Sequence, residues 1–351
     1  MGRFAIAAGP RAQRYRRIVG QITYSSGSTP SVNGGIPKTG YLTNIDLNSS
    51  IQVVTGASAP VIAGYGVYGP DQLVSFVVGP RAWVNIPGYH LKEFNKFYNL
   101  PWTDAYNAAP IVTSSTNNWQ GSLRIPLAAD TNSELGAFYL GDQELNTNLQ
   151  VTCAAASTVF STVNGATIQG SWNVEVERFA APAPDQKNGW LNEVSFIHEL
   201  RLFGTFQLKN GDTNIQLDLD RDYQRIILIF FTGSDKDSTF APANGLFTQL
   251  SLLVNDEVRI YDTVTEQQLL EEMDWNYNIK QWNAGSYAID FMAQKNNSRR
   301  DVLPTDSAVV KSLNLVITST STSNFVDVVT ESMIDSPYAK KWAESAKRMA
   351  A

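Results

Sequence analysis

The stretch GLFTQLSLLVNDEVRIYDTVTEQQLLEEM, residues 245–273, follows the same plan as GPDQLVSFVVGPRAWVNIPGYHLKEFNKF, residues 69–97. Each starts with a glycine, passes through Gln-Leu into a short apolar run, turns, and runs apolar again before a helical pattern. Short runs rich in β-branched residues indicate strands, and apolar residues at intervals of three and four indicate a helix. Each stretch therefore predicts a strand pair followed by one short helix.

The similarity continues on both sides of these stretches. YLTNIDLNSSIQVV, from Tyr41, has a counterpart in DYQRIILIFF, whose tyrosine is Tyr223, and TNLQVT is matched by SLNLVIT. A repeat of roughly 180 residues is far longer than the 20–50 residues of solenoid repeats, so it predicts two whole domains of one fold. Chance similarity between two β-rich halves is the alternative, and the recurrence of a single helix at the same place argues against it.

Each half holds roughly eight strand candidates, irregularly spaced and separated by long loops, which favours a jelly roll over a propeller or an up-and-down barrel. The fold class expected is all-β: two tandem eight-stranded jelly rolls, each with a short helix, plus a basic N-terminal arm and a C-terminal amphipathic helix. The expected boundaries are 1–35 for the arm, 36–181 for the first jelly roll, 182–189 for a linker, 190–332 for the second jelly roll and 333–351 for the C-terminal helix.

The amino-acid composition excludes several classes of function. Charged residues make up 17% of the 351 residues, below the roughly 25% of typical soluble domains. This composition suits either an all-β protein with many turns or a protein whose surface is largely covered by copies of the same chain. The net charge of −6 gives no case for nucleic-acid binding by the body of the protein. Cys153 is the only cysteine, which excludes an intramolecular disulfide and a zinc cluster. No signal peptide or membrane-length apolar run is found, so we expect a soluble protein made in a cytoplasm.

The two ends differ from the body and from each other. Five arginines precede Asp46, the first acidic residue: Arg3, Arg11, Arg14, Arg16 and Arg17. The stretch TYSSGSTPSVNGGIPKTG that follows cannot bury enough apolar surface to fold alone, so the arm is either disordered or ordered against a partner surface. At the other end, SPYAKKWAESAKRM has Ser336 as N-cap and Pro337 at the first helical position, with Tyr338, Trp342 and Met349 on one stripe.

Candidates for catalysis or metal binding are few. His90 and His198 are the only histidines, and they lie in different elements. The acidic run LDLDRD fails the EF-hand pattern because Tyr223 stands where glycine is needed. Glu175 and Glu177 share one strand face, as a glycosidase pair does, but the alternation with valines is that of any half-buried strand. We expect no catalytic residue, no metal and no cofactor.

The stretches IPKTGYLTNIDL, GPDQLVSFVV, RIPLAAD and GSYAIDF, in this order and with the repeat described above, resemble double jelly-roll major capsid proteins of tailless icosahedral viruses, including the tectivirus-like bacteriophage lineage. The resemblance spans residues 36–331 and rests on pattern and order rather than on an invariant motif. It implies a homotrimer whose six jelly rolls form a pseudo-hexagonal capsomer of an icosahedral virion shell. The implied partners are neighbouring capsomers, penton and minor capsid proteins, and an internal viral membrane or packaged genome contacted by the five arginines.

The competing hypothesis is a carbohydrate-binding or carbohydrate-cleaving two-domain jelly-roll protein. Eight tryptophans and fourteen tyrosines would supply its stacking platforms. The C-terminal stripe of Tyr338, Trp342 and Met349 is expected to dock on a neighbouring subunit or a membrane surface, unless both ends simply fray.

Overall fold

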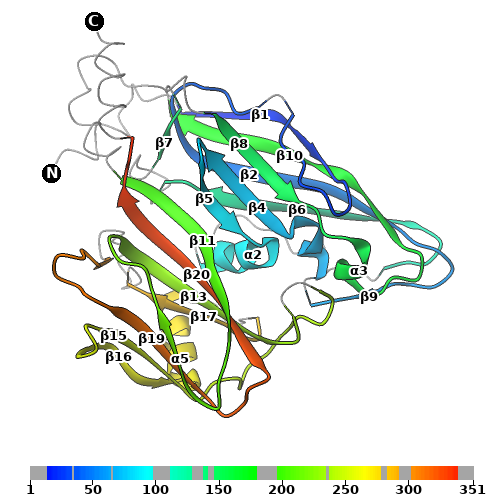
Figure 1. Cartoon of the computed structure of the whole chain (residues 1–351). Helices are drawn as coiled ribbons and strands as arrows, with labels where there is room; N and C mark the ends of the chain where they lie inside the picture. The colour runs from blue at the N-terminus through cyan, green and yellow to red at the C-terminus, as the bar shows by residue number, and fades with distance from the viewer. Residues whose placement is uncertain are drawn as a thin grey trace, which may run out of the picture. The chain divides into compact units, whose positions relative to one another are not determined.

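The structure, a computed structural model, describes residues 14–33, 35–64, 66–97, 111–128, 137–140, 146–179, 196–234, 237–277, 283–291 and 302–338. The chain forms two compact units. Unit 1 comprises Met1–Glu199 and Ile334–Ala351, and unit 2 comprises Leu200–Met333. Figure 1 shows the strands and helices of both units along the chain.

Unit 1 is built on long antiparallel strands in the order β1-β10-β2-β6, with β7 also paired to β2 (Figure 1). A second group of strands pairs β5 with β4 and β4 with β8. The strands described in this unit are β1 (Arg14–Thr23), β2 (Tyr41–Val54), β3 (Val61–Ile62), β4 (Leu73–Val78), β5 (Arg81–Ile86), β6 (Thr116–Pro126), β7 (Phe138–Tyr139), β8 (Thr147–Thr152), β9 (Phe160–Thr162) and β10 (Thr167–Phe179). Its helices are the 3-10 helix η1 (Gly66–Asp71), α2 (Gly88–Phe97) and α3 (Ala156–Val159).

Unit 2 repeats this plan. Strand β13 pairs with β20 along one edge and with β14, β17 and β18 along the other, while a second sheet has the order β12-β19-β15-β16. The strands are β11 (Phe196–Gln207), which begins in unit 1, β12 (Gly211–Gln216), β13 (Asp222–Thr232), β14 (Ala241–Pro242), β15 (Gln249–Val254), β16 (Val258–Thr265), β17 (Ser286–Asp290), β18 (Leu303–Pro304), β19 (Leu313–Ser319) and β20 (Asn324–Asp335), which ends in unit 1. Its helix is α5 (Glu266–Tyr277).

The main strands and one helix of each unit are paired and connected in the same way. Strand β2 pairs with β10, β6 and β7, as β13 pairs with β20, β17 and β18. Strand β4 pairs with β5 and β8, as β15 pairs with β16 and β19. Helix α2 follows the β4–β5 hairpin, and α5 follows the β15–β16 hairpin. Two antiparallel sheets with these connections form a jelly roll, so the predicted fold class is confirmed.

Each unit has an aromatic core between its sheets. In unit 1 the ring of Phe138, from β7, meets those of Phe76 and Trp83 edge-on, with centroids 5.3 and 5.4 Å apart. In unit 2 the ring of Phe230, from β13, stacks on Phe247 at 4.4 Å. Edge-on and offset rings are the favoured aromatic geometries, and all five side chains are buried. Alternate residues of β4 and β8 add to the core of unit 1, whereas β13 in unit 2 is buried at every residue from Tyr223 to Phe231.

The expected arm, residues 1–35, is corrected in its second half. Residues Arg14–Thr23 form strand β1, paired along β10 from Arg14–Phe179 to Thr23–Ser171. Ser31 then bridges Gln150 of β8, and the Val32 N–H donates to Leu149 O at 3.0 Å. Strand β1 lies beside β10 as β11 lies beside β20, and Ser31 bridges β8 as β12 pairs with β19. The first jelly roll therefore begins at Arg14 and not at residue 36, because the polar Ser-Gly-Pro stretch is a turn between two paired segments.

The other boundaries need smaller changes. Strand β20 continues to Asp335, so the expected C-terminal helix cannot begin at residue 333. The expected linker, 182–189, lies outside the described residues. Helix α5 begins with a capping box formed by Thr265 and Gln268. The N–H of Gln268 donates to Thr265 Oγ1, and the N–H of Thr265 donates to Gln268 Oε1, which is the reciprocal pattern of a capping box.

Candidate functional site

The structure describes four of the eight residues that the sequence predicts to act at the two ends of the chain. Arg3 and Arg11 lie outside the described residues, as do Trp342 and Met349. Arg14, Arg16 and Arg17 lie in β1. Tyr338 is placed at the end of the described chain, where its N–H donates to Ser336 Oγ at 3.2 Å, the bond an N-cap serine makes. Its ring lies 6.3 Å from that of Trp83.

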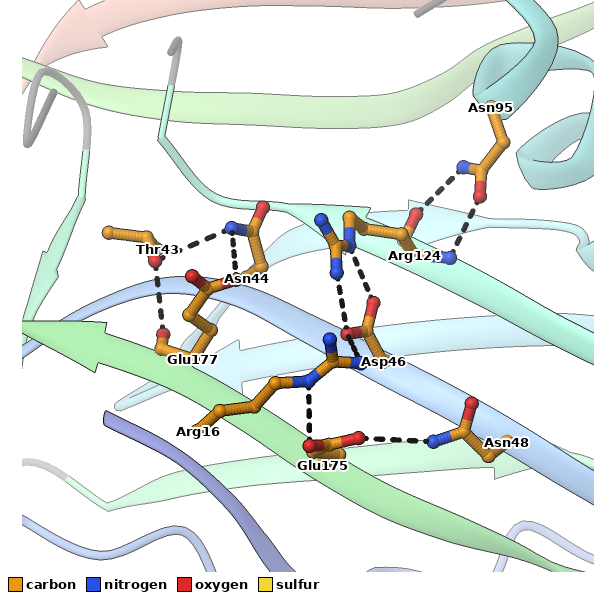
Figure 2. Close-up of polar contacts among 9 residues, drawn as sticks. All are labelled: Arg16, Thr43, Asn44, Asp46, Asn48, Asn95, Arg124, Glu175 and Glu177. Atoms are coloured by element: carbon orange, nitrogen blue, oxygen red, sulfur yellow. Dashed lines mark hydrogen bonds and ion pairs between the residues drawn. The ribbon is translucent and has the colours of Figure 1, made fainter. Parts of the chain in front are cut away.

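Arg16 is part of a charged ladder that crosses four strands of unit 1 (Figure 2). Its guanidinium lies 2.6 Å from Glu175 Oε1 of β10 and 3.1 Å from Asp46 Oδ2 of β2. Asp46 also accepts two hydrogen bonds from Arg124 of β6, at 2.7 and 2.8 Å. The positions are set by register, because Asp46 stands opposite Glu175 on one side and Arg124 on the other. Arg16 thus joins the sheet and does not belong to a detached arm.

Neutral side chains complete the ladder. Asn95 of α2 accepts a hydrogen bond from the Arg124 N–H and donates to the Arg124 carbonyl, which fixes the helix to the edge of β6 (Figure 2). Asn48 donates to Glu175, and Asn44 donates to Glu177, both at 3.4 Å. The two glutamates that a glycosidase reading would use are therefore held by structural contacts.

The ion pair of Asp46 and Arg124 is the central ion pair of unit 1. Unit 2 has an ion pair on the equivalent strands, with the acid and the arginine exchanged. Arg225 of β13 stands opposite Asp290 of β17, as Asp46 of β2 stands opposite Arg124 of β6. Arg225 donates to Asp290 Oδ2 at 2.6 and 2.8 Å, and its third nitrogen lies 3.4 Å from Glu331 Oε2 of β20. All three side chains are buried. A buried charge is tolerated when it is paired and hydrogen-bonded, and both units meet that condition at equivalent strands.

Asp71 is a buried acid that the sequence does not single out. It ends η1 and packs under the start of α2, where a Cβ on Gly88 would lie 2.0 Å from the Asp71 carbonyl oxygen. Oxygen Oδ1 of Asp71 has no hydrogen-bond partner. Burial raises the pKa of Asp71 to about 8, and the Trp172 indole offsets only part of that rise. The folded protein therefore holds this carboxyl protonated at neutral pH.

The remaining chemical candidates do not converge on a site. Among the described residues, no three His, Cys, Asp or Glu side chains are placed to hold a metal ion. His90 and His198 are buried in separate elements. Asp218 pairs with Arg201 and Arg221.

Of the four tryptophans in the described part of the chain, three are buried (Trp83, Trp119 and Trp172), so they cannot serve as carbohydrate-stacking platforms. No helix of the described chain is long and apolar enough to cross a membrane.

Comparison with known proteins gives matches in structure alone. No family model and no curated protein sequence matches the chain. The STIV MCP, from Sulfolobus turreted icosahedral virus, is 14% identical with a TM-score of 0.73, and the match covers 94% of this chain and 98% of that one. The major capsid protein of bacteriophage PM2 is 15% identical with a TM-score of 0.58, covering 93% and 99%. A PBCV-1 virus capsid model is 12% identical with a TM-score of 0.61, covering 92% and 94%. These similarities show a double jelly-roll fold along nearly the whole chain.

The ladder yields a prediction about stability. Substituting Asp46→Ala leaves Arg124 buried without its carboxylate, so we expect a loss of about 3–5 kcal/mol in the free energy of unfolding. Substituting Arg16→Ala removes a side chain that is 54% exposed, so we expect a loss of under about 1 kcal/mol. Urea denaturation at one fixed protein concentration measures both. Equal losses for the two variants would contradict the assignment of Arg124–Asp46 as the central pair.

Asp71 yields a prediction about pH. The pKa of Asp71 is about 8 in the folded protein and about 3.9 in an unfolded chain. The contribution of this carboxyl to the free energy of unfolding is therefore complete below the unfolded-chain pKa, the lower of the two values. That contribution is lost as pH rises through the upper one. The variant Asp71→Asn cannot ionise, so its unfolding free energy should fall less than that of the wild type between pH 5 and pH 9. Urea denaturation across this range tests it, and parallel curves for the two proteins would refute a protonated Asp71.

Proposed function

We propose that this chain is the major capsid protein of an icosahedral virus, located in the virion. The observation that carries the proposal is the match of both jelly rolls, over 94% of this chain, to a viral MCP that is itself covered to 98%. The acids and histidines considered for catalysis lie in ion pairs or in the core, and the described tryptophans do not favour the carbohydrate hypothesis.

The proposed assembly is a homotrimer of pseudo-hexagonal outline. Two units of one topology in each chain give six similar jelly rolls in three copies, and cyclic symmetry closes them into a ring. Such a ring can contact neighbouring capsomers on all sides, and penton and minor capsid proteins are the other proposed partners in the shell. The proposal needs an obligate interface, which buries more than about 2,000 Å².

Sedimentation and negative-stain imaging test the assembly directly. We expect the purified protein to sediment as a trimer at micromolar concentration and physiological salt, and its images to show six-sided particles. Obligate interfaces of this size keep subunits together at such concentrations. A stable monomer under these conditions would contradict the proposed function.

The basic segment before β1 is proposed to face an internal membrane or the packaged genome. Arg14, Arg16 and Arg17 lie in β1, and Arg16 is held there by Asp46 and Glu175, so the arginines of the segment before β1 are Arg3 and Arg11. Each basic residue near an anionic surface contributes about 1 kcal/mol, and the many copies of a shell multiply the effect. The C-terminal residues Trp342 and Met349 are proposed to dock on a neighbouring subunit, with Tyr338 anchored beside Trp83 of its own unit.

Removing residues 1–13 tests the role of this segment without disturbing β1, which begins at Arg14. We expect the truncated protein to form trimers as the full chain does, but to bind phosphatidylserine vesicles or to assemble into particles less well. The difference should shrink at high salt because the attraction is electrostatic. If the truncated protein assembles and binds as well as the full chain, the segment has another role.

A further inference from the structure

Strand β16 is the most exposed long strand of unit 2. It ends the sheet β12-β19-β15-β16 and pairs with β15 along one edge only. None of its eight residues is buried. Val258 is 60% exposed and Ile260 is 36% exposed. An edge strand that presents unpaired backbone groups and aliphatic side chains is a ready surface for another chain.

Helix α5 adds acidic charge beside β16. The Tyr261 hydroxyl donates to Glu272 Oε1 at 2.7 Å, which holds the helix against the strand. The helix buries only Leu269 and Met273 and exposes Glu271 and Asp274. The equivalent helix of unit 1, α2, is buried at all ten of its residues. Together β16 and α5 carry five carboxylates and one arginine, so this surface is both acidic and partly apolar.

Strand β1 has the complementary character. It ends the sheet β1-β10-β2-β6 and contains three arginines and no acid. The second half of its free edge is covered, because Asn33 exchanges hydrogen bonds with the backbone of Gln21 at 2.5 and 3.0 Å. For the first half, the part of the chain that the structure describes supplies no strand along this edge. There Arg17 is exposed and Ile18 is 60% exposed.

We propose that the surface of β16 and α5 binds the first half of β1 from a second copy of this chain. Ile18 of one copy then packs against Val258 and Ile260 of the other, and Arg17 lies near Glu271 and Asp274. Opposite charges on two separate surfaces of the same chain favour this pairing and disfavour a surface binding to itself. This inference rests on the proposed capsid function and names the contact that joins the subunits.

The proposed contact is head-to-tail, since β1 and β16 are different parts of the chain. A head-to-tail contact repeats from copy to copy and closes into a ring when the rotation allows, as a trimer requires. A two-fold dimer would instead need one surface to contact itself. The charge and the exposed aliphatic residues therefore agree with the symmetry of the proposed assembly.

Cysteine cross-linking tests the contact, because Cys153 is the only cysteine and is buried. The variants Ile18→Cys and Ile260→Cys are coexpressed and treated with a short bis-maleimide. We expect a covalent dimer from the coexpressed pair and none from either variant alone. The double variant should give a covalent trimer. The control pairs Ile260→Cys with Val112→Cys, another exposed aliphatic residue of unit 1, and should give no product.

Charge-reversal substitutions test the same contact without a cross-linking reagent. Arg17→Glu should raise the concentration at which the trimer dissociates about tenfold, and adding Glu271→Lys with Asp274→Lys should reverse most of that rise. Lys209→Glu, an equal change at an exposed site of unit 2 away from this surface, should have little effect. Trimers that form without cross-links and without sensitivity to Arg17 would overturn this contact and leave the proposed function standing. A monomer throughout would overturn both.

Discussion

The antiparallel pairing of β10 with β2, and of β20 with β13, is the interaction on which the rest of each unit depends. Strand β2 pairs with β10 over nearly all its length, and β13 does so with β20. Because side chains alternate between the two faces of a strand, one residue of slippage would bring the apolar set to the wrong face. The observed register places Ile45 and Leu47 in the core and turns Asp46 toward Arg124 and Arg16.

Local patterns predicted the parts of the fold that local forces determine. The two hairpins, the helices α2 and α5 and the repeat were readable because apolar periodicity reports which face of an element is buried. Strand β1 was missed because its arginines suggested an arm. One of them, Arg16, faces acids of neighbouring strands that lie about 30 and 160 residues further along the chain, and no sequence window contains such partners.

The candidate site was harder to predict for the same reason. Asp46 and Arg124 are 78 residues apart and meet only through the β2–β6 register. Asp71 lies in a turn-like stretch, Gly-Pro-Asp-Gln, that usually indicates exposure. Its burial follows from the close approach of Gly88 at the start of α2. Such features depend on the assembled unit, so composition and spacing carry no trace of them.

The exchanged charges of the two central ion pairs bear on how the chain avoids misfolding. Tandem domains of one fold are prone to exchange equivalent strands while they fold. Here an exchange of β6 and β17 would set Asp46 against Asp290 and Arg225 against Arg124 in the registers that each unit uses. Like charges forced together in a poorly solvated sheet are strongly unfavourable. The opposite polarity of the two pairs therefore disfavours an exchange of β6 and β17 between the two halves of the chain.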